Sequence, residues 1–456
     1  MSDAEFGFVT PETLPLFTDL YELTMMQGYH ERGHNPRATF SLFFRRLPAD
    51  RGYVVAAGLA QALEFVERLS FGDRAVAYLA DQGFGEGFLD HLAALEFTGD
   101  IRALPEGTPV FPDEPILEVT APLIQAQLLE TLLLNQVSFQ TLVATKAARM
   151  RDVASRDGGD RTLVDFGSRR AHGTDAGVKA ARAAFVGGFD GTSNVAAGEL
   201  FDLPVFGTMA HSWVQSFETE RAAFEAFLDT YGDGATLLVD TYDTLRGAEL
   251  AVEVAEERGL DLGGVRLDSG DLAALSGEVR EIVGADVDVF VSSGVDEYAI
   301  EEFLSAGGDA DGFGPGTALV TSDDAPTLDA VYKLVAVERE GRLEPTMKLS
   351  TGKVTYPGPK SLHRVERDGR FVRDALDLAG VDGPGEEQLV TVVSDGTRTY
   401  DPPPLGETRE RARAAVEKLP EGCRRLRDPD PYEVAVGDAL REETEALREA
   451  LAADRT

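Results

Sequence analysis

The stretch from residue 237 to residue 271 decides the fold. It begins with a short apolar run that ends in polar residues, "LLVDTYD" (237–243), and continues with an amphipathic helical segment, "LRGAELAVEVAEERG" (245–259). A second run of the first kind, "GVRLDSGD" (264–271), follows after a short turn. Short buried strands that alternate with helices in this way predict right-handed βαβ units and a parallel sheet.

The same pattern recurs on both sides of this stretch, between about residue 160 and residue 321. Four more apolar runs end in polar clusters: "LVDFGSRRAHG" (163–173), "VFGTMAHS" (205–212), "VFVSSGVD" (289–296) and "DGFGPGTALVT" (311–321). Six units in series favour a closed (β/α) barrel, and a doubly wound open sheet is the alternative. Functional groups of such barrels lie on the loops after the strands, so we expect the six clusters to share one rim.

The flanking regions have a different character. Residues 1–135 combine amphipathic helices with strand-like runs, and Thr18 is expected to cap a helix over 19–33. Residues after about 335 suggest antiparallel strands followed by helices. We therefore expect an N-terminal α+β domain over 1–135, the barrel with the active site over 136–335, and a C-terminal segment over 336–456 that packs on both.

Composition narrows the function. The chain has 80 acidic and 43 basic residues, a net charge of −37, spread along its whole length. Such a charge repels nucleic acid and anionic membranes, and it is typical of the salt-adapted surface of halophilic proteins. Because no apolar run approaches the roughly 20 residues of a membrane span and the N-terminus lacks a signal-like pattern, we expect a soluble cytoplasmic protein. The single cysteine, Cys423, excludes internal disulfides and multi-cysteine metal sites.

Basic residues that oppose this trend are candidates for function. Only seven lysines occur, and we expect four of them to neutralise phosphate: Lys333, Lys348, Lys353 and Lys360. Arginines and aspartates also meet in the six clusters, namely Arg169, Arg170, Arg266, Asp240, Asp243, Asp268 and Asp271. Arginine suits carboxylates and phosphates, whereas the aspartates suit hydrated Mg²⁺ or ribose hydroxyls, although Asp243 and Asp271 could instead be helix N-caps. With the glycine-rich "GFGPGTALV" (312–320), this set indicates an anionic phosphorylated sugar or nucleotide handled with Mg²⁺.

His211 follows a strand end between small residues and is one of only six histidines. It could be a hydrogen-bonded rim residue, a general acid or base, a metal ligand or a nucleophile. The metal-ligand role is least favoured, because no second histidine follows at three or four residues and no cysteine is near. Phosphate chemistry on the same rim favours an imidazole that accepts a phosphoryl group.

Eight motifs in order resemble those of the nicotinate phosphoribosyltransferase family. They are "TDLYELTMMQGY" (18–29), "FFRRLP" (43–48), "DFGSRRAHG" (165–173), "GGFDGTSNVAAGELFDLPVFGTMAHSW" (187–213), "VDTYDTLRG" (239–247), "GVRLDSGDL" (264–272), "GTALVT" (316–321) and "VYKLV" (331–335). The resemblance covers about residues 15–365. It implies the type II phosphoribosyltransferase fold, in which an irregular α/β barrel is joined to an α+β domain built from both chain ends, and a homodimer. It also implies ATP-coupled synthesis of nicotinate mononucleotide from nicotinate and phosphoribosyl pyrophosphate.

The resemblance implies a role for each of several residues. His211 would be phosphorylated by ATP, and Asp268 would act beside it as a catalytic residue. The nicotinate site would consist of Tyr21 from the neighbouring subunit, Phe166, Arg169, Ser193, Thr208 and Arg266. Phosphoribosyl pyrophosphate would contact Arg169, Asp240, Gly294, Gly316 and Thr317, and Mg²⁺ would be held through water by Asp240 and Asp268.

Three other functions fit these residues less well than nicotinate phosphoribosyltransferase does. Nicotinamide phosphoribosyltransferases have an aspartate where this chain has Ser193, and an aspartate would repel nicotinate by about 1–4 kcal/mol at intermediate dielectric. Quinolinate phosphoribosyltransferases are shorter, need a more basic site and have no phosphorylated histidine. A non-catalytic sugar-phosphate-binding barrel leaves His211, Tyr21 and Phe166 without a role. Nicotinate is therefore the preferred substrate.

Overall fold

Contacts within the chain divide it into two units. The computed structural model describes residues 9–348 and 355–453. Unit 1 consists of Met1–Thr141, Thr327–Pro404 and Lys418–Thr456, and unit 2 of Leu142–Pro326 and Leu405–Glu417. The expected boundaries lie after residues 135 and 335, whereas the first segment of unit 2 begins at Leu142 and ends at Pro326. Residues 405–417, expected in the C-terminal segment, also belong to unit 2.

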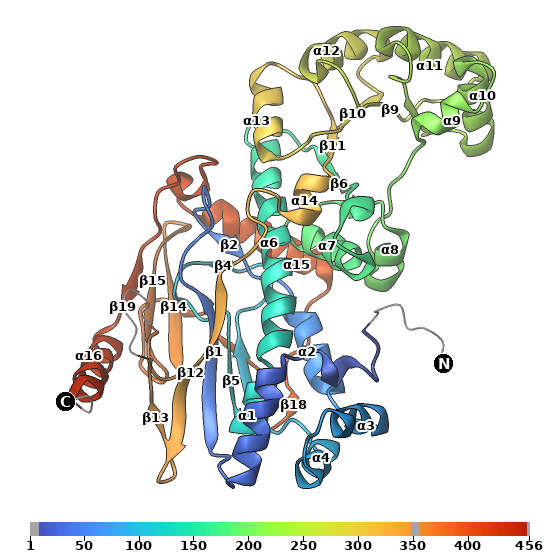
Figure 1. Cartoon of the computed structure of the whole chain (residues 1–456). Coiled ribbons are helices and arrows are strands. Elements are labelled where there is room, and N and C mark those ends of the chain that lie inside the picture. The colour runs from blue at the N-terminus through green and yellow to red at the C-terminus, as the bar shows by residue number, and fades with distance from the viewer. Residues whose placement is uncertain (1–8, 349–354, 454–456) are drawn as a thin grey trace. The chain divides into compact units, whose positions relative to one another are not determined.

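Unit 1 is built around an antiparallel sheet with strands from both ends of the chain (Figure 1). β1 (Arg37–Phe44) lies between β5 (Leu117–Pro122) and β12 (Ala330–Arg339). Seven of the eight residues of β1 are buried, which explains its nearly continuous apolar sequence. The sheet continues through β13 (Arg342–Pro345) on one side and, on the other, through β3 (Asp100–Ala103), β17 (Val390–Ser394) and β18 (Thr397–Arg398).

The rest of unit 1 comprises two small sheets and several helices. The sheets are β2 (Val54–Val55) with β4 (Pro109–Val110), and β16 (Glu386–Glu387), β14 (Lys360–Arg367), β15 (Arg370–Leu378) and β19 (Val434–Val436) in that order. The helices are α1 (Leu20–Glu31), α2 (Leu59–Arg68), α3 (Asp73–Asp81), α4 (Glu86–Ala93), α5 (Leu123–Leu128) and α16 (Asp438–Ala453). α6 (Glu130–Ala154) begins in unit 1 and ends in unit 2.

Thr18 does not cap α1, so this prediction was wrong. The N-cap is Asp19, and the Thr18 hydroxyl donates instead to the carboxylate of Glu22. Thr131 at the start of α6 donates to the same carboxylate through its backbone N–H, at 3.2 Å, and through its hydroxyl, at 2.8 Å. Glu22 is fully buried, and burial raises its pKa to about 7 in spite of these hydrogen bonds.

Glu22→Gln is expected to stabilise the protein at pH 8 but not at pH 5. An acid whose pKa is raised on folding binds more protons in the native state, so stability falls as pH rises from the ordinary value of 4.5 towards 7. The neutral amide avoids this cost and can donate to Thr18 while accepting from Thr131. Thermal unfolding of both proteins should show a gain on the order of 1–2 kcal/mol at pH 8 for the variant. A constant difference from pH 5 to pH 8 would contradict the assignment.

Unit 2 contains a parallel sheet in the spatial order β7, β6, β11, β10, β9, β8. These strands are β6 (Thr162–Asp165), β7 (Gly191–Thr192), β8 (Thr236–Leu238), β9 (Gly264–Leu267), β10 (Asp288–Ser292) and β11 (Gly312–Gly314). Its helices are α7 (Thr174–Val186), α8 (Val195–Phe201), α9 (His211–Gln215), α10 (Glu220–Tyr231), α11 (Thr244–Arg258), α12 (Leu272–Val283), α13 (Glu297–Ser305), α14 (Thr317–Thr321) and α15 (Leu405–Lys418), whose last residue lies in unit 1.

The strand order shows an irregular (β/α) barrel, as predicted. The last strand, β11, pairs with the first, β6, and Thr192 of β7 forms a parallel bridge with Val205. The strands therefore follow chain order around a ring with one seam, between Val205 and β8. The Thr208 hydroxyl crosses this seam by donating to the carbonyl oxygen of Thr236 in β8.

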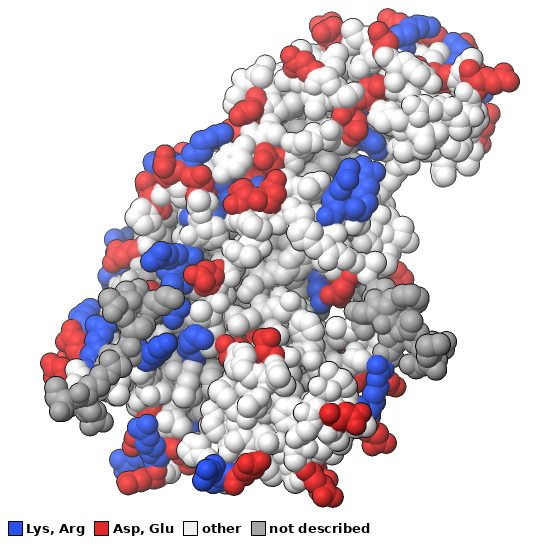
Figure 2. Space-filling model, in the orientation of Figure 1, with Lys and Arg blue, Asp and Glu red and all other residues white. Residues whose placement is uncertain are grey.

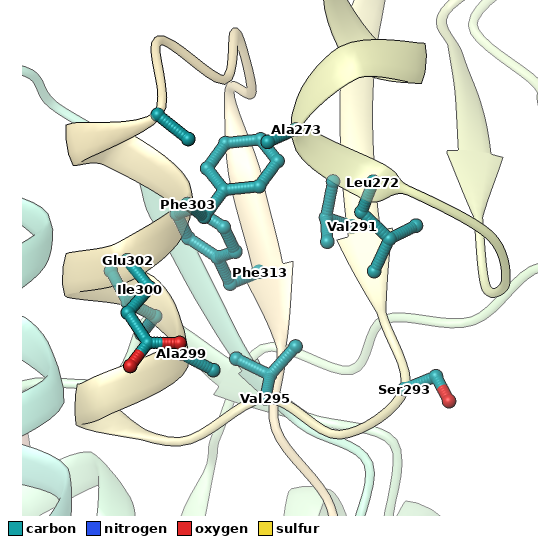
Figure 3. A pocket seen from close by; sticks show the side chains of 11 residues that line it. Leu272, Ala273, Val291, Ser293, Val295, Ala299, Ile300, Glu302, Phe303 and Phe313 are labelled. Carbon is teal, nitrogen blue, oxygen red and sulfur yellow. The ribbon is translucent and has the colours of Figure 1, made fainter.

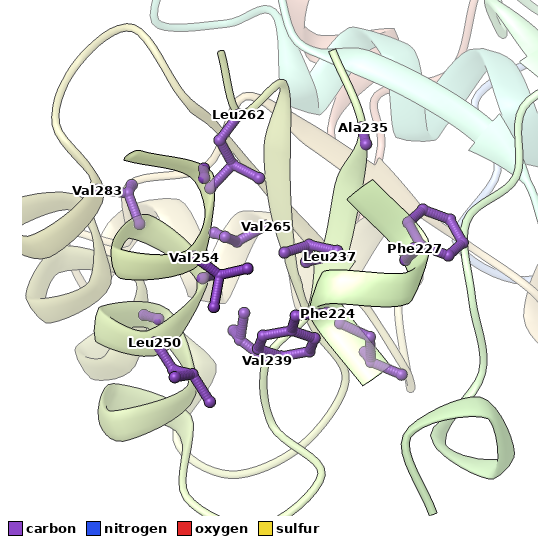
Figure 4. Packing of buried hydrophobic residues seen from close by; sticks show 14 of the residues in the cluster. Phe224, Phe227, Ala235, Leu237, Val239, Leu250, Val254, Leu262, Val265 and Val283 are labelled. Atoms are coloured by element: carbon purple, nitrogen blue, oxygen red, sulfur yellow. The ribbon is translucent and has the colours of Figure 1, made fainter. Parts of the chain in front are cut away.

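Apolar side chains from α10 and α11 pack against β8 and β9 and form part of the core of unit 2 (Figure 4). Phe224 of α10 and Val254 of α11 are fully buried with Leu237 and Val265 of the strands. Trp213 packs against this cluster and donates its indole N–H to the carbonyl oxygen of Ala223 at 3.1 Å. This packing anchors the short helix α9.

Charged side chains of both signs lie on the surface of the protein. Figure 2 shows acidic and basic side chains interspersed over the face displayed, with no extended basic area on it. Among the helices in residues 9–348 and 355–453, none is both long enough and apolar enough to traverse a bilayer.

Candidate active site

Loops at the carboxyl ends of the strands of unit 2 enclose a cavity of about 640 Å³. Five of the six predicted clusters contribute to its lining; the cluster after β8 does not. Nine predicted site residues line it: Phe166, Arg169, Ser193, Thr208, Arg266, Asp268, Gly294, Gly316 and Thr317. His211 and Asp240 lie beside the lining residues Ala210 and Asp268. Tyr21 belongs to α1 of unit 1, where its side chain is 48% exposed.

One end of the cavity combines an aromatic ring with a guanidinium group. The Cζ of Arg266 lies 5.8 Å from the centroid of the Phe166 ring, a distance typical of cation–π contact. Phe166 packs at 5.7 Å against Phe290 of the neighbouring strand β10. A flat aromatic acid could stack on the Phe166 ring with its carboxylate towards Arg266.

Gly314 also shapes this end of the cavity, a role that was not predicted from the sequence. A Cβ atom added to Gly314 would lie 2.6 Å from Cε2 of Phe166, closer than real side chains approach. The ring therefore takes its place only because β11 has no side chain there. A glycine inside a strand that precedes a polar cluster was the signal available in the sequence.

Gly314→Ala is expected to displace the Phe166 ring and to lower activity by about 10–100-fold, with a stability cost of about 1–3 kcal/mol. Gly207→Ala is the matched control. Gly207 lines the same cavity, but a Cβ there would meet no atom within 4 Å. Initial rates and thermal unfolding of both variants test this, and equal activities for the two would contradict the proposed role of Gly314.

Three arginines of the cavity lack acidic partners. Within the described residues, no carboxylate lies within ion-pair distance of Arg169, Arg170 or Arg266, although the chain has 80 acidic residues. Arg266 donates only to the carbonyl oxygen of Met209, at 3.3 Å, and its buried Nε has no partner. Burial lowers the pKa of Arg266, and Arg169 adds to this effect, while Asp268 and Asp240 oppose it. Buried guanidinium groups remain charged, so this group would be stabilised by an anionic ligand.

Asp165 holds two predicted nicotinate-binding loops together. Its fully buried carboxylate accepts from the Gly167 N–H at 2.7 Å, next to Phe166, and from the Thr192 hydroxyl at 2.9 Å, next to Ser193. Burial raises the pKa of this carboxyl group in spite of both hydrogen bonds. Asp165 therefore positions the ends of β6 and β7.

The structure brings His211 together with both predicted aspartates. Its Nε2 lies 3.8 Å from Oδ2 of Asp268 and 4.0 Å from Oδ1 of Asp240. Its Nδ1 lies 3.1 Å from the hydroxyl of Thr241. This bond fixes the ring orientation and directs Nε2 towards the carboxylates.

Hydroxyl and amide groups fix the two aspartates in turn. Asp240 Oδ2 accepts from the Asp268 N–H at 2.8 Å and from the Ser269 hydroxyl at 2.6 Å. Asp268 Oδ1 accepts from the Ser292 hydroxyl at 2.6 Å. Thr241, Ser269 and Ser292 belong to the predicted polar clusters, but their roles in positioning His211, Asp240 and Asp268 were not predicted from the sequence.

The two aspartates suit a hydrated Mg²⁺. Among the residues that the structure describes, the buried Oδ1 of Asp240 has no hydrogen-bond partner, and Oδ2 of Asp268 lies close only to His211. Within the described part of the chain, no group of three or more His, Cys, Asp or Glu residues could hold a metal on its own. Mg²⁺ commonly uses one or two carboxylates and completes its shell with water and substrate phosphates, so the donor set fits.

A second wall of the cavity consists of the loops after β10 and β11. Ser293 and Gly294 after β10 have φ angles of 77° and 64°. Two successive left-handed residues turn the chain sharply, and this conformation is unfavourable for a serine. Gly316 and Thr317 after β11 lie on the same wall. Backbone N–H groups and the Thr317 hydroxyl are suited to phosphate oxygens.

Other predicted roles are corrected or refined. Asp243 and Asp271 are helix N-caps that accept from the N–H groups of Arg246 and Ala274. The prediction that Lys360 neutralises phosphate was wrong, because Lys360 is buried in unit 1 at 3.6 Å from Glu118. Lys333 lies 3.6 Å from Glu130, and Lys353 falls outside the described residues.

Comparisons with known proteins agree with these features. Residues 16–138, 162–361 and 385–443 match, in this order, the nicotinate phosphoribosyltransferase (NAPRTase) N-terminal domain, the nicotinate phosphoribosyltransferase (NAPRTase) family and the nicotinate phosphoribosyltransferase C-terminal domain. The third match lies in a region where no motif had pointed to the family.

Comparison with individual proteins also indicates the nicotinate phosphoribosyltransferase family. A nicotinate phosphoribosyltransferase of Mycobacterium tuberculosis is 47% identical over 444 residues, covering 95% of this chain and 94% of its own. One from Bacillus subtilis is 47% identical over 372 residues, covering 79% and 75%. The crystal structure of human nicotinic acid phosphoribosyltransferase superposes with a TM-score of 0.83 at 32% identity and covers 94% of this chain and 99% of the human one.

Proposed function

Because the chain belongs to the nicotinate phosphoribosyltransferase family, we propose that it joins nicotinate to the ribose of phosphoribosyl pyrophosphate. The products are nicotinate mononucleotide and diphosphate, and the reaction serves NAD biosynthesis. ATP hydrolysis is coupled to it through phosphorylation of His211.

The observation that carries the proposal is the partly buried Arg266 guanidinium, which lies beside the Phe166 ring and has no acidic partner among the described residues. It suits a ligand that is both aromatic and anionic, which describes nicotinate. Arg169 on the neighbouring loop would contact both the bound base and the pyrophosphate. Ser193 lines the same cavity and brings no negative charge to it, which favours the acid over nicotinamide. The Thr208 hydroxyl already donates to β8, so Thr208 would contact nicotinate only as an acceptor or through its methyl group.

The sugar phosphate would bind on the second wall, which contains Gly294, Gly316 and Thr317. The pyrophosphate would then lie between this wall and Asp240 and Asp268. When bound through these carboxylates, Mg²⁺ would neutralise negative charge on the departing pyrophosphate.

Substitution takes place at the anomeric carbon of the ribose. The bond to pyrophosphate breaks ahead of formation of the new C–N bond, so positive charge develops on the sugar. Arg169 would stabilise the departing anion, and the stack on Phe166 would hold the ring nitrogen close to the anomeric carbon. The nitrogen already carries a lone pair, so no general base is required.

His211 is proposed as the phosphoryl acceptor. Donation of the Nδ1 proton to Thr241 would leave a lone pair on Nε2, which attacks the γ-phosphorus of ATP; an N–P bond forms, a P–O bond breaks and ADP leaves. Water later cleaves the N–P bond. This cycle would favour productive binding of phosphoribosyl pyrophosphate and drive net synthesis.

A homodimer is proposed as the active assembly, with Tyr21 of one subunit completing the base stack of its partner. Support comes from the exposed apolar side chains Val195, Leu200, Val205 and Phe206 of unit 2 and from the exposed ring of Tyr21. Burial and the neighbouring Glu130 raise the pKa of Tyr21, so its hydroxyl stays neutral at physiological pH.

A product assay tests the proposal. Nicotinate and nicotinamide are compared side by side with phosphoribosyl pyrophosphate, with and without ATP, at high KCl because of the acidic surface. We expect nicotinate mononucleotide as the main product and a higher yield with ATP. Turnover of nicotinamide alone would refute the assignment to the acid.

A further inference from the structure

Lys146 of α6 carries a fully buried ammonium group that the proposed reaction does not use. Its Nζ lies 2.8 Å from Oε2 of Glu297 and donates to Oδ1 of Asp324 at 2.7 Å. The side chains of Lys146 and Glu297 are both 0% exposed. Burying a charge is costly unless its partners are well placed, so this arrangement calls for an explanation.

The partners of Lys146 belong to two different segments that line the cavity or adjoin its lining. Glu297 is the first residue of α13 and directly follows the loop Ser292–Asp296, which lines the cavity. Asp324 lies shortly after α14, whose first residue Thr317 lines it as well. One ammonium group thus joins the loop after β10 to the segment after β11.

Glu297 is held from a second side by Arg149, one turn further along α6. The Nε of Arg149 donates to Oε1 of Glu297 at 2.9 Å, and another of its nitrogens donates to the Tyr298 hydroxyl at 3.0 Å. Burial lowers the pKa of Lys146, but attraction to Glu297 and hydrogen bonding to Asp324 outweigh burial and raise it. Lys146 is therefore charged, and each oxygen of Glu297 faces one cation.

Apolar packing alone does not fix the start of α13. A cavity of about 280 Å³ lies between this helix, α12 and the strands, and Ile300 and Phe303 of α13 line it together with Val295 and Phe313 (Figure 3). Val295 also lines the larger cavity. Because contacts are missing on this side of α13, the polar link through Glu297 has more influence on the loop that precedes the helix.

On the basis of the proposed function, we propose that Lys146 is a positioning residue for phosphoribosyl pyrophosphate. Its ammonium group fixes the separation of the loops 292–296 and 316–324 and so sets the affinity for the sugar phosphate without touching it. The nicotinate end, on the loops after β6 and β9, does not depend on this link.

Lys146→Met tests the proposal, because it keeps the apolar stem of the side chain and leaves Arg149 to compensate Glu297. Hydrogen exchange of the backbone should accelerate by about 10-fold in residues 292–297 and 316–324 and stay unchanged in residues 264–271. The KM for phosphoribosyl pyrophosphate should rise about 10-fold, whereas the KM for nicotinate should change less than about 2-fold.

Lys179→Met is the matched control, since Lys179 is paired with Asp175 of the same helix in the same unit. It should alter neither loop. Asp324→Asn, at a partly exposed residue, weakens the arm of the link that reaches residues 316–324, where Asp323 stays 3.5 Å from Nζ of Lys146. It should accelerate exchange only in residues 316–324, with a KM increase of about 3-fold. This variant decides the matter if Lys146→Met does not fold.

Unchanged exchange in both loops, or equal rises in the two KM values, would overturn the proposal. If the wild-type protein turned over neither substrate, the proposed function would fail. The exchange comparison would still decide whether Lys146 links the loops.

Discussion

Arg266→Met is expected to raise the KM for nicotinate by about 100-fold, the effect of losing a charge-assisted, two-pronged contact worth about 1.5–3 kcal/mol. The guanidinium is partly buried, lacks an acidic partner among the described residues and lies 5.8 Å from the Phe166 ring centroid. Without a ligand, its burial is compensated only in part, by the Met209 carbonyl oxygen and by attraction to Asp268 and Asp240. Methionine should therefore not lower the melting temperature, and initial rates together with thermal unfolding measure both effects.

Two comparisons make this result specific. Arg170→Met removes another arginine of the same rim that lacks an acidic partner among the described residues, but Arg170 is exposed and belongs to the 3-10 turn Ser168–Arg170, whereas Arg266 lies in β9 beside the Phe166 ring. It should change the KM for nicotinate by less than about 3-fold. Nicotinamide, which has no carboxylate, should lose little from Arg266→Met. Equal losses for the acid and the amide would show that Arg266 supports the fold of the site and does not bind a carboxylate.

The barrel and most of the candidate site were predictable because both are encoded locally. A strand, a polar cluster and a helix follow one another within about 30 residues, and parallel strands bring their carboxyl ends to one edge. This rule alone places Arg266, Asp268 and Gly294 near one another. The six clusters and their order around the ring were therefore visible in the sequence.

Contacts between distant residues were not predictable in the same way. The fit of Phe166 against Gly314 and the bond between His211 and Thr241 depend on strand register, which no local pattern specifies. The assignment of residues 405–417 to unit 2 depends on side-chain contacts such as Arg409 with Asp190, at 3.2 Å. Composition alone gave a wrong prediction for Lys360. Lysine is rare in this chain, but Lys360 compensates the charge of the buried Glu118 carboxylate and not that of a phosphate.

His211→Ala is expected to abolish labelling of the protein by γ-labelled ATP, lowering it at least about 100-fold, and to remove the stimulation of activity by ATP. Phosphohistidine is stable to alkali and labile to acid, so the wild-type label should show both properties. The Nε2 atom is the group that the site supplies as a nucleophile: it lies within 4.0 Å of both carboxylates suited to Mg²⁺, and its ring is oriented by Thr241.

Two further variants separate this role from a general effect on the rim. His172→Ala removes an exposed histidine of the loop after β6 and should keep full labelling. Thr241→Val removes the partner of Nδ1 while keeping the shape of the side chain. If that bond selects the tautomer with a lone pair on Nε2, the variant should be labelled about 10-fold more slowly but to the same final extent. Labelling of His211→Ala at the wild-type rate would refute the phosphohistidine, and the ATP requirement would then have to arise at another group.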